Sequence, residues 1–369
     1  MIAGVAESAL GAVPEGTRPE DLMAQAAVAA LAECGLELGD VDGLFAAASQ
    51  LNMPTLSAGD YLGIQPRYTD STNIGGSSFI AHLNHAAAAI ETGRCEVALI
   101  VYGSTQRLVG RTGAATKEVD PYEAPYEPAN PMASYALAAS RHIHEFGTTP
   151  EQLAEVAVSA RRWAQLNPKA WARDELTIAD VLASPRVCDP FGVRDCCLVT
   201  DGGAAAVLVR ADSGLARVAL LGAGEAHTHR HISGMPDLTR TAAVESGARA
   251  FAEAELSPGD VDVLMLYDAF TITPILFLED LGFCGKGDGG AYVEGGRTAP
   301  GGDGLPVNTN GGGLSYCHPG MYGLLEIVEA VRQLRGECGE RQVDGARIAL
   351  VHGNGGVLSS QCTALLGLS

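Results

Sequence analysis

The pattern of apolar and polar residues predicts one structural unit that occurs twice along the chain. Residues 19–34 are rich in Ala and Leu and carry acids in the first turn, which indicates a helix, and a turn and an apolar strand follow. Residues 241–255 show the same helical pattern and are also followed by an apolar strand. The turns at 39–42 and 259–262 both read GDVD. An internal repeat of this kind predicts two similar α/β halves.

The second part of each unit places a glycine-rich loop before an apolar helix and a strand. Residues 71–76 read STNIGG and precede a helical pattern and a strand at 97–102. Residues 308–313 read NTNGGG and precede a helical pattern over 321–334 and a further strand. Chance similarity between ordinary α/β units is the alternative, but the shared order of elements favours a repeat.

An insertion at about residues 107–190 interrupts the first half. It begins with a loop rich in Pro, Glu and Tyr and then shows two helical patterns. Long insertions with their own structure are commonly lids or substrate-binding elements. Arg107, Arg111 and Lys117 supply positive charge there, and each can equally be a solvated loop residue.

Composition and charge exclude several classes of protein. The 369 residues are enough for one or two domains, and their 47% hydrophobic content with many Ala and Gly suits packed α/β layers. A net charge of -20 argues against nucleic acid or an anionic membrane as the partner and is compatible with a basic protein partner. We expect no signal peptide and no membrane span, because the first residues lack a basic region and no apolar run is long enough.

The cysteines indicate a reducing compartment. There are nine, an odd number, and no pair has the C-x-x-C spacing. Neither a disulfide framework nor a zinc site is therefore predicted, and we expect a cytoplasmic protein.

The stretch 308–323, NTNGGGLSYCHPGMYG, carries the most chemistry. Its glycines, Gly311 and Gly312 among them, allow close approach of the backbone to a ligand. The helix that follows adds partial positive charge at its N-terminus. His318 would therefore lie at the mouth of an oxyanion-binding turn, or else it is a hydrogen-bonded core histidine behind an ordinary glycine loop.

This stretch, DCCLVTDGGAAAVLV and YDAFTITPILFLEDLGFCGKGDGG together resemble the thiolase superfamily over nearly the whole chain. The resemblance is closest to sterol-carrier-protein-type thiolases and thiolase-like acyl-CoA aldolases. It implies a thiolase fold of two pseudo-symmetric halves, 1–212 and 213–369, in a five-layered α-β-α-β-α sandwich. It also implies a homodimer with the strand 97–102 near the two-fold axis, and a small zinc-ribbon/OB-fold partner protein. Coenzyme A would be part of the substrate, with no tightly bound cofactor and no metal.

The departures from the thiolase motifs matter most for function. Asn73 lies where the nucleophilic cysteine of the C-x-S-G loop is expected, and Tyr267 replaces the histidine of the H-D-C-F motif. The last C-x-G motif reads HGNGG, so that either His352 or Gly353 takes the place of the cysteine. The G-H-P motif keeps its histidine, His318.

Thiolysis requires a covalent acyl-enzyme on an activated thiolate, which an asparagine cannot form. His318 can still stabilise a thioester oxyanion, with Tyr267 as second donor or as the base for a substrate hydroxyl. These groups suit retro-aldol cleavage of a β-hydroxyacyl-CoA, or its reverse. Asn73 would donate to the thioester or cap the helix that begins near residue 77, and His352 is catalytic or a core residue.

Three further points stay open. Cys317, beside His318, is a base or a small buried residue, and Gly355 and Gly356 are further candidates for binding the thioester. A true thiolase with a displaced cysteine such as Cys317 is one alternative function, and a non-catalytic acyl-CoA- or lipid-binding subunit is another. The remaining candidates are read as packing or structural residues: His82, His85, Cys196, Cys197, Cys284 and Cys362.

Overall fold

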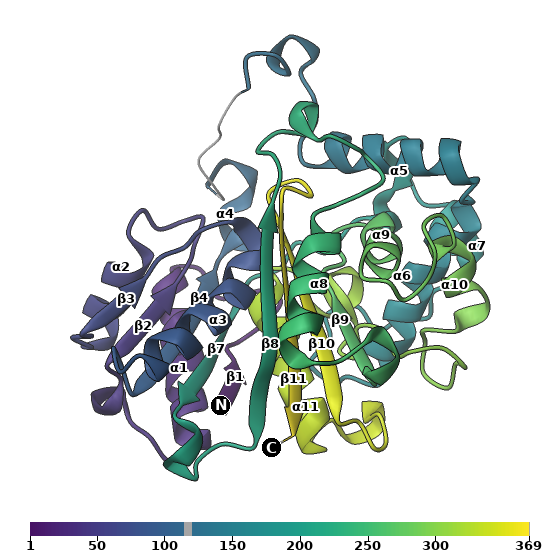
Figure 1. The fold of residues 1–369 in the computed structure, drawn as a ribbon. Coiled ribbons are helices and arrows are strands. Elements are labelled where there is room, and N and C mark those ends of the chain that lie inside the picture. The colour runs from purple at the N-terminus through teal and green to yellow at the C-terminus, as the bar shows by residue number, and fades with distance from the viewer. Residues whose placement is uncertain (114–119, 369) are drawn as a thin grey trace.

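The structure is a computed structural model that describes residues 1–113 and 120–368, without the side chains of residues 111–113. The predicted cations Arg111 and Lys117 lie outside the described side chains. A nine-stranded sheet with the order β3-β2-β4-β7-β1-β8-β11-β10-β9 runs through the molecule (Figure 1). Its strands are β1 Ile2–Glu7, β2 Gly43–Ala46, β3 Tyr68–Asp70, β4 Val97–Ser104, β7 Gly202–Val209, β8 Val218–His227, β9 Val263–Leu266, β10 Ile348–Gly355 and β11 Ser360–Leu368.

The two halves of this sheet have the same pattern of strand pairing. In the first, β2 is parallel to β4, and β7 pairs antiparallel with both β4 and β1. In the second, β9 is parallel to β10, and β11 pairs antiparallel with both β10 and β8. The halves meet at a single residue pair, Ile2 with Val218. A boundary at residue 212 would fall between β7 and β8, and the division into two domains stays a prediction.

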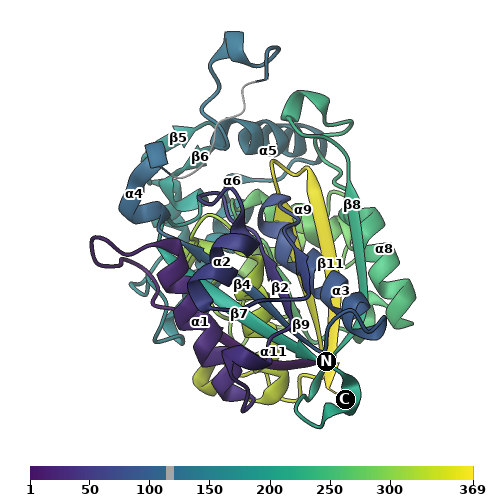
Figure 2. The same ribbon diagram turned by 90° about the vertical axis from the view of Figure 1, so that its left-hand side faces the viewer.

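Helices cover the sheet in layers. Helix α1 (Pro19–Glu33) packs outside the first half and α8 (Ala243–Ala254) outside the second. Between the halves lie α3 (Ser78–Glu91) and α11 (Gly323–Arg335), which contact each other and strands of both halves. This order of helix, sheet, helices, sheet and helix is the expected five-layered sandwich (Figures 1 and 2).

Glycines let the two central helices approach closely. A Cβ at Gly323 would lie 2.3 Å from the carbonyl oxygen of Gly76, and a Cβ at Gly353 would lie 2.9 Å from Cα of Ser77. No larger residue fits these positions without moving backbone. Gly323 at the start of α11 and Gly353 near the end of β10 therefore have a packing role, which draws the starts of α3 and α11 and the end of β10 together.

The insertion lies between β4 and β7, over residues 105–201, whereas residues 356–359 make the corresponding connection between β10 and β11. It lies across the upper part of Figure 1, with a segment that projects from the body. Its elements are α4 Gln106–Gly113, α5 Met132–Phe146, α6 Pro150–Gln165, α7 Ile178–Leu182 and the hairpin β5 Arg186–Cys188 with β6 Phe191–Gly192. Thr149 caps α6 in a reciprocal capping box with Gln152.

The prediction that the strand at 97–102 makes the dimer contact is wrong for this fold. That strand is β4, which is paired on both edges, with β2 and with β7. It has no free edge for a second copy, and its residues from Ala98 to Ser104 are buried. The strands at the ends of this sheet are β3 and β9, and the outer edge of β9 is paired with residues 306–308, as in the bridge between Leu264 and Val307.

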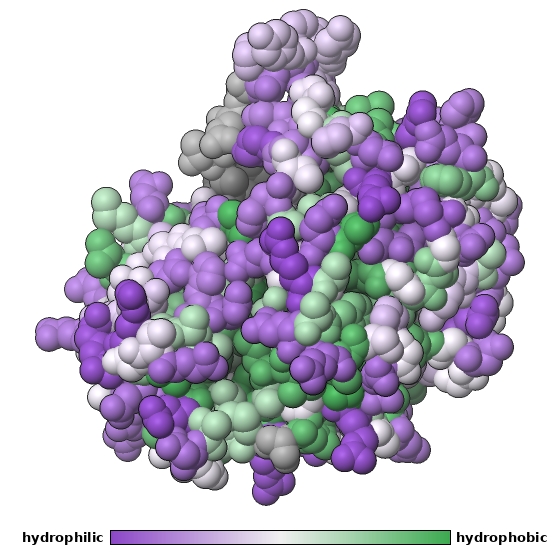
Figure 3. Space-filling model, in the orientation of Figure 1, coloured by the Kyte–Doolittle hydropathy of each residue, from purple (hydrophilic) through white to green (hydrophobic). Residues whose placement is uncertain are grey.

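The surface gives no sign of a membrane-spanning segment. No described helix is both long and apolar enough to cross a bilayer. On the face that Figure 3 shows, apolar residues are interspersed with polar ones. Helix α2 (Pro54–Leu62) beside β2 and the buried helix α9 (Ile272–Asp280) after β9 complete the architecture that positions the site.

Candidate active site

Tyr267 and His318 form the centre of the candidate site. Tyr267 follows β9, and His318 lies in the turn before α11. The phenol oxygen of Tyr267 lies 3.1 Å from Nε2 of His318, and the rings are nearly perpendicular at 88°. The backbone N–H of Tyr322 donates to the same phenol oxygen at 3.2 Å. The structure thus brings together the two residues that the sequence singled out, and adds Tyr322.

Burial keeps both groups uncharged at neutral pH. It lowers the pKa of His318 to about 4 and raises the pKa of Tyr267 well above its ordinary value. Among the described residues, Nδ1 of His318 has no hydrogen-bond partner. Thr200 fixes the histidine backbone, since the N–H of His318 donates to Oγ1 of Thr200 at 2.9 Å. A neutral imidazole and a neutral phenol can stabilise an oxyanion by donation without a fixed charge.

Asp268 holds the glycine loop beside this pair. Its carboxylate accepts from the N–H of Gly313 at 2.6 Å and from that of Leu314 at 3.2 Å. Burial raises the pKa of Asp268 to about 7. A Cβ at Gly312, where φ is 64°, would lie 2.0 Å from the carboxylate, and one at Gly311 would lie 2.6 Å from Ala164. The structure thus gives Gly311 and Gly312 a packing role, and contact with a ligand stays a proposal.

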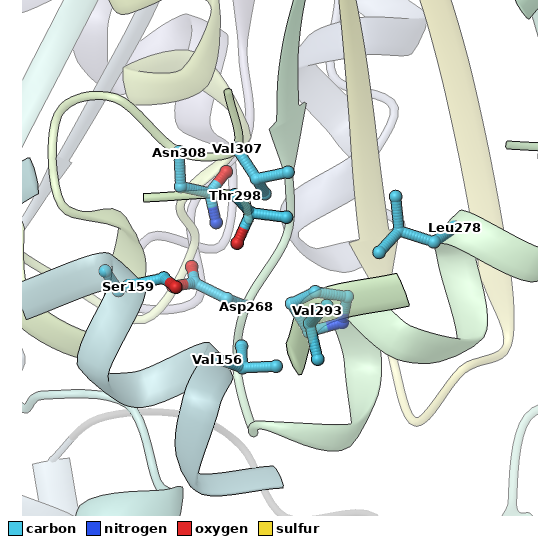
Figure 4. A pocket seen from close by; sticks show the side chains of 10 residues that line it. Val156, Ser159, Asp268, Leu278, Val293, Thr298, Val307 and Asn308 are labelled. Atoms are coloured by element: carbon cyan, nitrogen blue, oxygen red, sulfur yellow. The ribbon is translucent and has the colours of Figure 1, made fainter. Parts of the chain in front are cut away.

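A small cavity lies beneath the same loop. Ser159, Thr298, Asn308 and the carboxylate of Asp268 line it together with apolar side chains (Figure 4). Its volume is about 10 Å³, which is near the minimum for one water molecule. This cavity cannot hold an acyl chain, so it belongs to the support of the loop.

The turn over residues 73–76 meets the end of β10 at the other side of Tyr267. A Cβ at Gly76 would lie 2.1 Å from the Tyr267 ring, and one at Gly75 would lie 2.7 Å from the backbone of both Gly355 and Gly356. The predicted residues Gly355 and Gly356 therefore do lie against this turn. Asn73 itself is exposed, and its amide donates to the carbonyl oxygen of Ala48 at 3.2 Å.

Asn73 does not cap helix α3. The N-cap position is Ser77, and the hydroxyl of Ser78 makes the local bonds, accepting from the N–H of Ile74 at 2.9 Å and donating to the carbonyl of Gly75 at 2.6 Å. The capping alternative for Asn73 is therefore wrong. Whether its amide reaches a bound thioester stays a prediction.

Both ring nitrogens of His352 already have hydrogen-bond partners inside the protein, so neither can bind a substrate. It is fully buried, with Nδ1 at 2.9 Å from Oγ1 of Thr363 and Nε2 at 2.9 Å from Oε1 of Gln361. Burial lowers its pKa to about 3. The reason is strand parity: side chains alternate between the faces of β10, and the next residue, Gly353, is the one that packs on α3. His352 is therefore a buried core residue and not a catalytic one.

The thiols differ in access. Cys317 is fully buried, and burial raises its pKa well above the ordinary value, so it cannot act as a thiolate in this geometry. Cys197 is half-buried, and its N–H donates to the carbonyl of Ala269 at 2.9 Å, two residues after Tyr267. Its pKa is also raised by burial. The sequence alone predicts a structural role for Cys197, because its position beside the site depends on a long-range backbone contact.

Two other site residues have no local signal in the sequence. Tyr322 lies four residues after His318, and its ring stacks on the imidazole at 26°. Tyr135 comes from α5 of the insertion and reaches the end of β10, where its hydroxyl accepts from the amide of Asn354 at 2.7 Å. The described residues contain no group of three His, Cys, Asp or Glu side chains that could hold a metal ion.

Comparison with known proteins gives four informative similarities. Residues 224–368 match the family described as "Thiolase C-terminal domain-like". The chain is 34% identical to "Acetyl-CoA acetyltransferase" of Methanothermobacter thermautotrophicus over 91% of both chains. It is 30% identical to "17-hydroxy-3-oxo-4-pregnene-20-carboxyl-CoA lyase" of Mycobacterium tuberculosis over 92% of both. Among solved structures, the "Ltp2-ChsH2(DUF35) aldolase" superposes with a TM-score of 0.89 at 29% identity, covering 100% of this chain and 97% of that one.

Proposed function

This chain belongs to the thiolase superfamily, and from that premise we propose that it cleaves a carbon–carbon bond in a CoA thioester. The reaction we propose is retro-aldol cleavage of a β-hydroxyacyl-CoA. The observation that carries this proposal is the uncharged Tyr267–His318 pair in a position where the sequence lacks the nucleophilic cysteine. Two relatives of high coverage carry the names lyase and aldolase, which supports the same class of reaction.

The hydrogen bonds around Tyr267 determine which donor of the Tyr267–His318 pair stays free for the thioester oxygen. The N–H of Tyr322 occupies one lone pair of the phenol oxygen. If Nε2–H of His318 occupies the other, the phenol proton is free to bond the thioester oxygen, and Nδ1 is free to accept a proton. If instead the phenol donates to Nε2, the free donor is Nδ1–H. In either tautomer the pair keeps one donor for the oxyanion.

The proposed steps balance without a further reactant. A base removes the β-hydroxyl proton, the bond between Cα and Cβ breaks, and a carbonyl product leaves. The electron pair passes to the thioester as an enolate, whose oxygen the free donor of the Tyr267–His318 pair stabilises. Protonation at Cα then gives the shortened acyl-CoA. Coenzyme A enters only as part of the substrate.

A true thiolase is the second candidate, because one relative of equal coverage is named an acetyltransferase. It would need an accessible thiol. Cys317 is fully buried, whereas Cys197 is half-buried beside the loop of Tyr267. Cys197 is therefore the better position for a displaced nucleophile, although burial raises its pKa.

We also propose a small zinc-ribbon/OB-fold partner, which the thiolase resemblance implies and which the name of the similar structure, "Ltp2-ChsH2(DUF35) aldolase", supports. Co-expression with such a protein should raise soluble yield and turnover. Equal yield and turnover of the chain alone would contradict it. All nine cysteines are free, which is compatible with the cytoplasm as the proposed compartment.

A homodimer is the proposed assembly, with β3 as the contact strand. Its outer edge is unpaired, and an unpaired edge can pair with a second copy. Thr69→Pro removes a backbone donor from β3 and should shift light scattering from dimer to monomer. A wild-type monomer at micromolar concentration would refute the dimer, and a dimer unaffected by Thr69→Pro would refute the role of β3.

The deciding experiment is turnover of a panel of β-hydroxyacyl-CoA thioesters with and without free CoA. We expect a ketone or aldehyde and a shortened acyl-CoA at the same rate in both cases. Stoichiometric uptake of free CoA, or an acyl group on Cys197 or Cys317 by mass spectrometry, would support the thiolase instead. Binding of the thioesters without any turnover would support a non-catalytic acyl-CoA-binding subunit.

A further inference from the structure

A continuous chain of buried hydrogen bonds runs from the outer helix α8 to the insertion. It passes through side chains of α8, β11, β10 and α5 and ends on the turn after β10. Its bonds are Ser246 Oγ to Thr363 Oγ1 at 2.9 Å, Thr363 Oγ1 to His352 Nδ1 at 2.9 Å, His352 Nε2 to Gln361 Oε1 at 2.9 Å, Gln361 Nε2 to Asn354 Oδ1 at 2.9 Å, Asn354 Nδ2 to Tyr135 Oη at 2.7 Å, and Tyr135 Oη to the Gly356 carbonyl oxygen at 3.3 Å.

The chain has one direction. Gly356 contributes a carbonyl, so the hydroxyl of Tyr135 donates to it and accepts from the amide of Asn354. The amide of Gln361 then donates to Asn354, and its oxygen accepts from Nε2–H of His352. Nδ1 of His352 accepts from a hydroxyl. The amide and imidazole groups are each satisfied in this one arrangement, which fits the neutral state that burial imposes on His352.

Tyr135 also has a second, apolar attachment. Its ring stacks on Phe270 at 4.5 Å and 28°, and Phe270 stacks on Phe191 of β6 at 5.2 Å and 20°. Phe270 lies three residues after Tyr267, and the other two rings belong to the insertion. Aromatic residues make up only 5% of the chain, so three stacked rings are unusual in it. They join the insertion to the segment after β9 that carries Tyr267.

The turn that Tyr135 holds is itself in contact with the site. Gly355 and Gly356 lie against Gly75, as described above, and a Cβ at Gly355 would lie 1.6 Å from the carbonyl oxygen of Ile74. Gly76 of the same segment touches the ring of Tyr267. A displacement of the turn after β10 would therefore move the 73–76 segment and the wall behind Tyr267.

We propose that Tyr135 is a positioning residue for the cleavage proposed above, on which this inference rests. Through Asn354 and Gly356 it couples the insertion to the 73–76 turn, and the chain through His352 fixes its hydroxyl. The insertion then sets the geometry of the thioester site. This also gives His352 a role: it directs the chain and does not touch the substrate.

Asn354→Asp tests the direction of the chain with an isosteric change. An ionised Asp at this position cannot donate to Tyr135, whose proton turns to the carboxylate and leaves Gly356. A protonated Asp can donate again and restores the arrangement. Burial raises the pKa of Tyr135 to about 12, raises the pKa of Cys197 and lowers the pKa of His352 to about 3, so these three groups do not ionise between about pH 5.5 and 8.5. Nε2 of His229 bonds the carbonyl of Val357 in the same turn at 2.9 Å, and burial lowers the pKa of this histidine. Since His229 is present in both proteins, the pH profile of Asn354→Asp is compared with that of wild type.

We expect kcat of Asn354→Asp to fall about tenfold at pH 8.5, the effect of one buried hydrogen bond. It should approach the wild-type value as pH falls. Tyr135→Phe keeps the ring stack and should lose about tenfold at every pH, and it also serves if Asn354→Asp does not fold. Phe277→Leu is the matched control: that ring packs on the imidazole of His352 at 4.5 Å outside the chain. It should lower Tm without changing kcat or its pH profile.

Hydrogen exchange measures the same coupling without substrate. Amides of residues 73–78 should exchange faster in Asn354→Asp and Tyr135→Phe than in wild type or Phe277→Leu. Lower Tm with unchanged kcat, unchanged pH profile and unchanged exchange at 73–78 would overturn the inference. A wild-type protein that cleaves no β-hydroxyacyl-CoA would refute the proposed function alone, because the exchange measurement still tests the coupling.

Discussion

Replacing Tyr267 by Phe removes one hydroxyl and keeps the ring that packs on Gly76. Where the phenol is the free donor of the pair, the variant loses the bond to the thioester oxygen, and where Nδ1–H of His318 is the free donor, it loses the bond that fixes this imidazole. One donor of this kind contributes about 10²–10³ in kcat. The change also leaves the N–H of Tyr322 and Nε2 of His318 without their partner. Each unpaired buried group costs about 1–3 kcal/mol, so both activity and stability should fall.

The two effects can be separated by their size. At about 2.1 cal/mol/K per residue, the 369 residues give an unfolding entropy near 0.8 kcal/mol/K, so that each kcal/mol shifts Tm by about 1.3 °C. Two unpaired groups then lower Tm by about 3–8 °C. Kinetics measured at least 20 °C below Tm use an essentially fully folded sample, and the loss of kcat is then a loss in the transition state.

Tyr316→Phe is the matched control. Tyr316 is as buried as Tyr267, but its hydroxyl donates to Glu7 at 2.9 Å, and Glu7 keeps the ion pairs to Arg332 and Lys169. We expect less than a threefold change in kcat for Tyr316→Phe and a fall of 100- to 1000-fold for Tyr267→Phe, assayed as cleavage of a β-hydroxyacyl-CoA. A fall of less than tenfold in Tyr267→Phe, or an equal fall in both variants, would refute the assignment.

Three further outcomes follow from the same site. His318→Ala should lower kcat by about two to three orders of magnitude, the effect of an oxyanion donor, and a normal kcat in a less stable protein would make it a core residue. Cys317→Ala should keep kcat within about twofold, because the thiol is fully buried; loss of activity with an intact fold would contradict this. Burial lowers the pKa of His82 to about 4, so the unfolded state binds a proton below about pH 6.5 that the folded state does not, and stability is lost as pH falls. Chemical denaturation should therefore show the free energy of unfolding of His82→Gln rising by about 3 kcal/mol relative to that of wild type as pH falls from 6.5 to 4. A difference between the two proteins that does not change with pH would refute this.

The repeat made much of the fold predictable, because its signals are local. Helical periodicity and the two GDVD turns placed α1, α8, β2 and β9, and the glycine loops placed α3 and α11. Strand pairing is a long-range property, so the sheet order, and with it the interior position of β4, could not be read from the sequence.

The candidate site was predictable where a motif carried it, as for the adjacent side chains of Tyr267 and His318, whose catalytic role stays a proposal. It was not predictable where long-range packing decides. His352 comes after a run of apolar residues, as a catalytic residue would. However, side chains alternate between the two faces of β10, and that of His352 lies on the face that packs in the core. Tyr135 lies 219 residues from the Asn354 to which it bonds, and no local pattern connects them.

The similarities to an acetyltransferase and to a lyase are compatible with each other on chemical grounds. Both reactions pass through an enolate of a CoA thioester, and an uncharged donor pair at the thioester oxygen serves either one. They differ in whether a thiolate accepts an acyl group. Overall identity of 34% or 30% cannot separate them, because that difference depends on very few atoms. In this chain an exposed amide, Asn73, takes the nucleophile's position in the motif, and the thiols nearest the pair have pKa values raised by burial. The chemistry left to the site is carbon–carbon cleavage through an enolate that is protonated to an acyl-CoA, without transfer of an acyl group to a thiol.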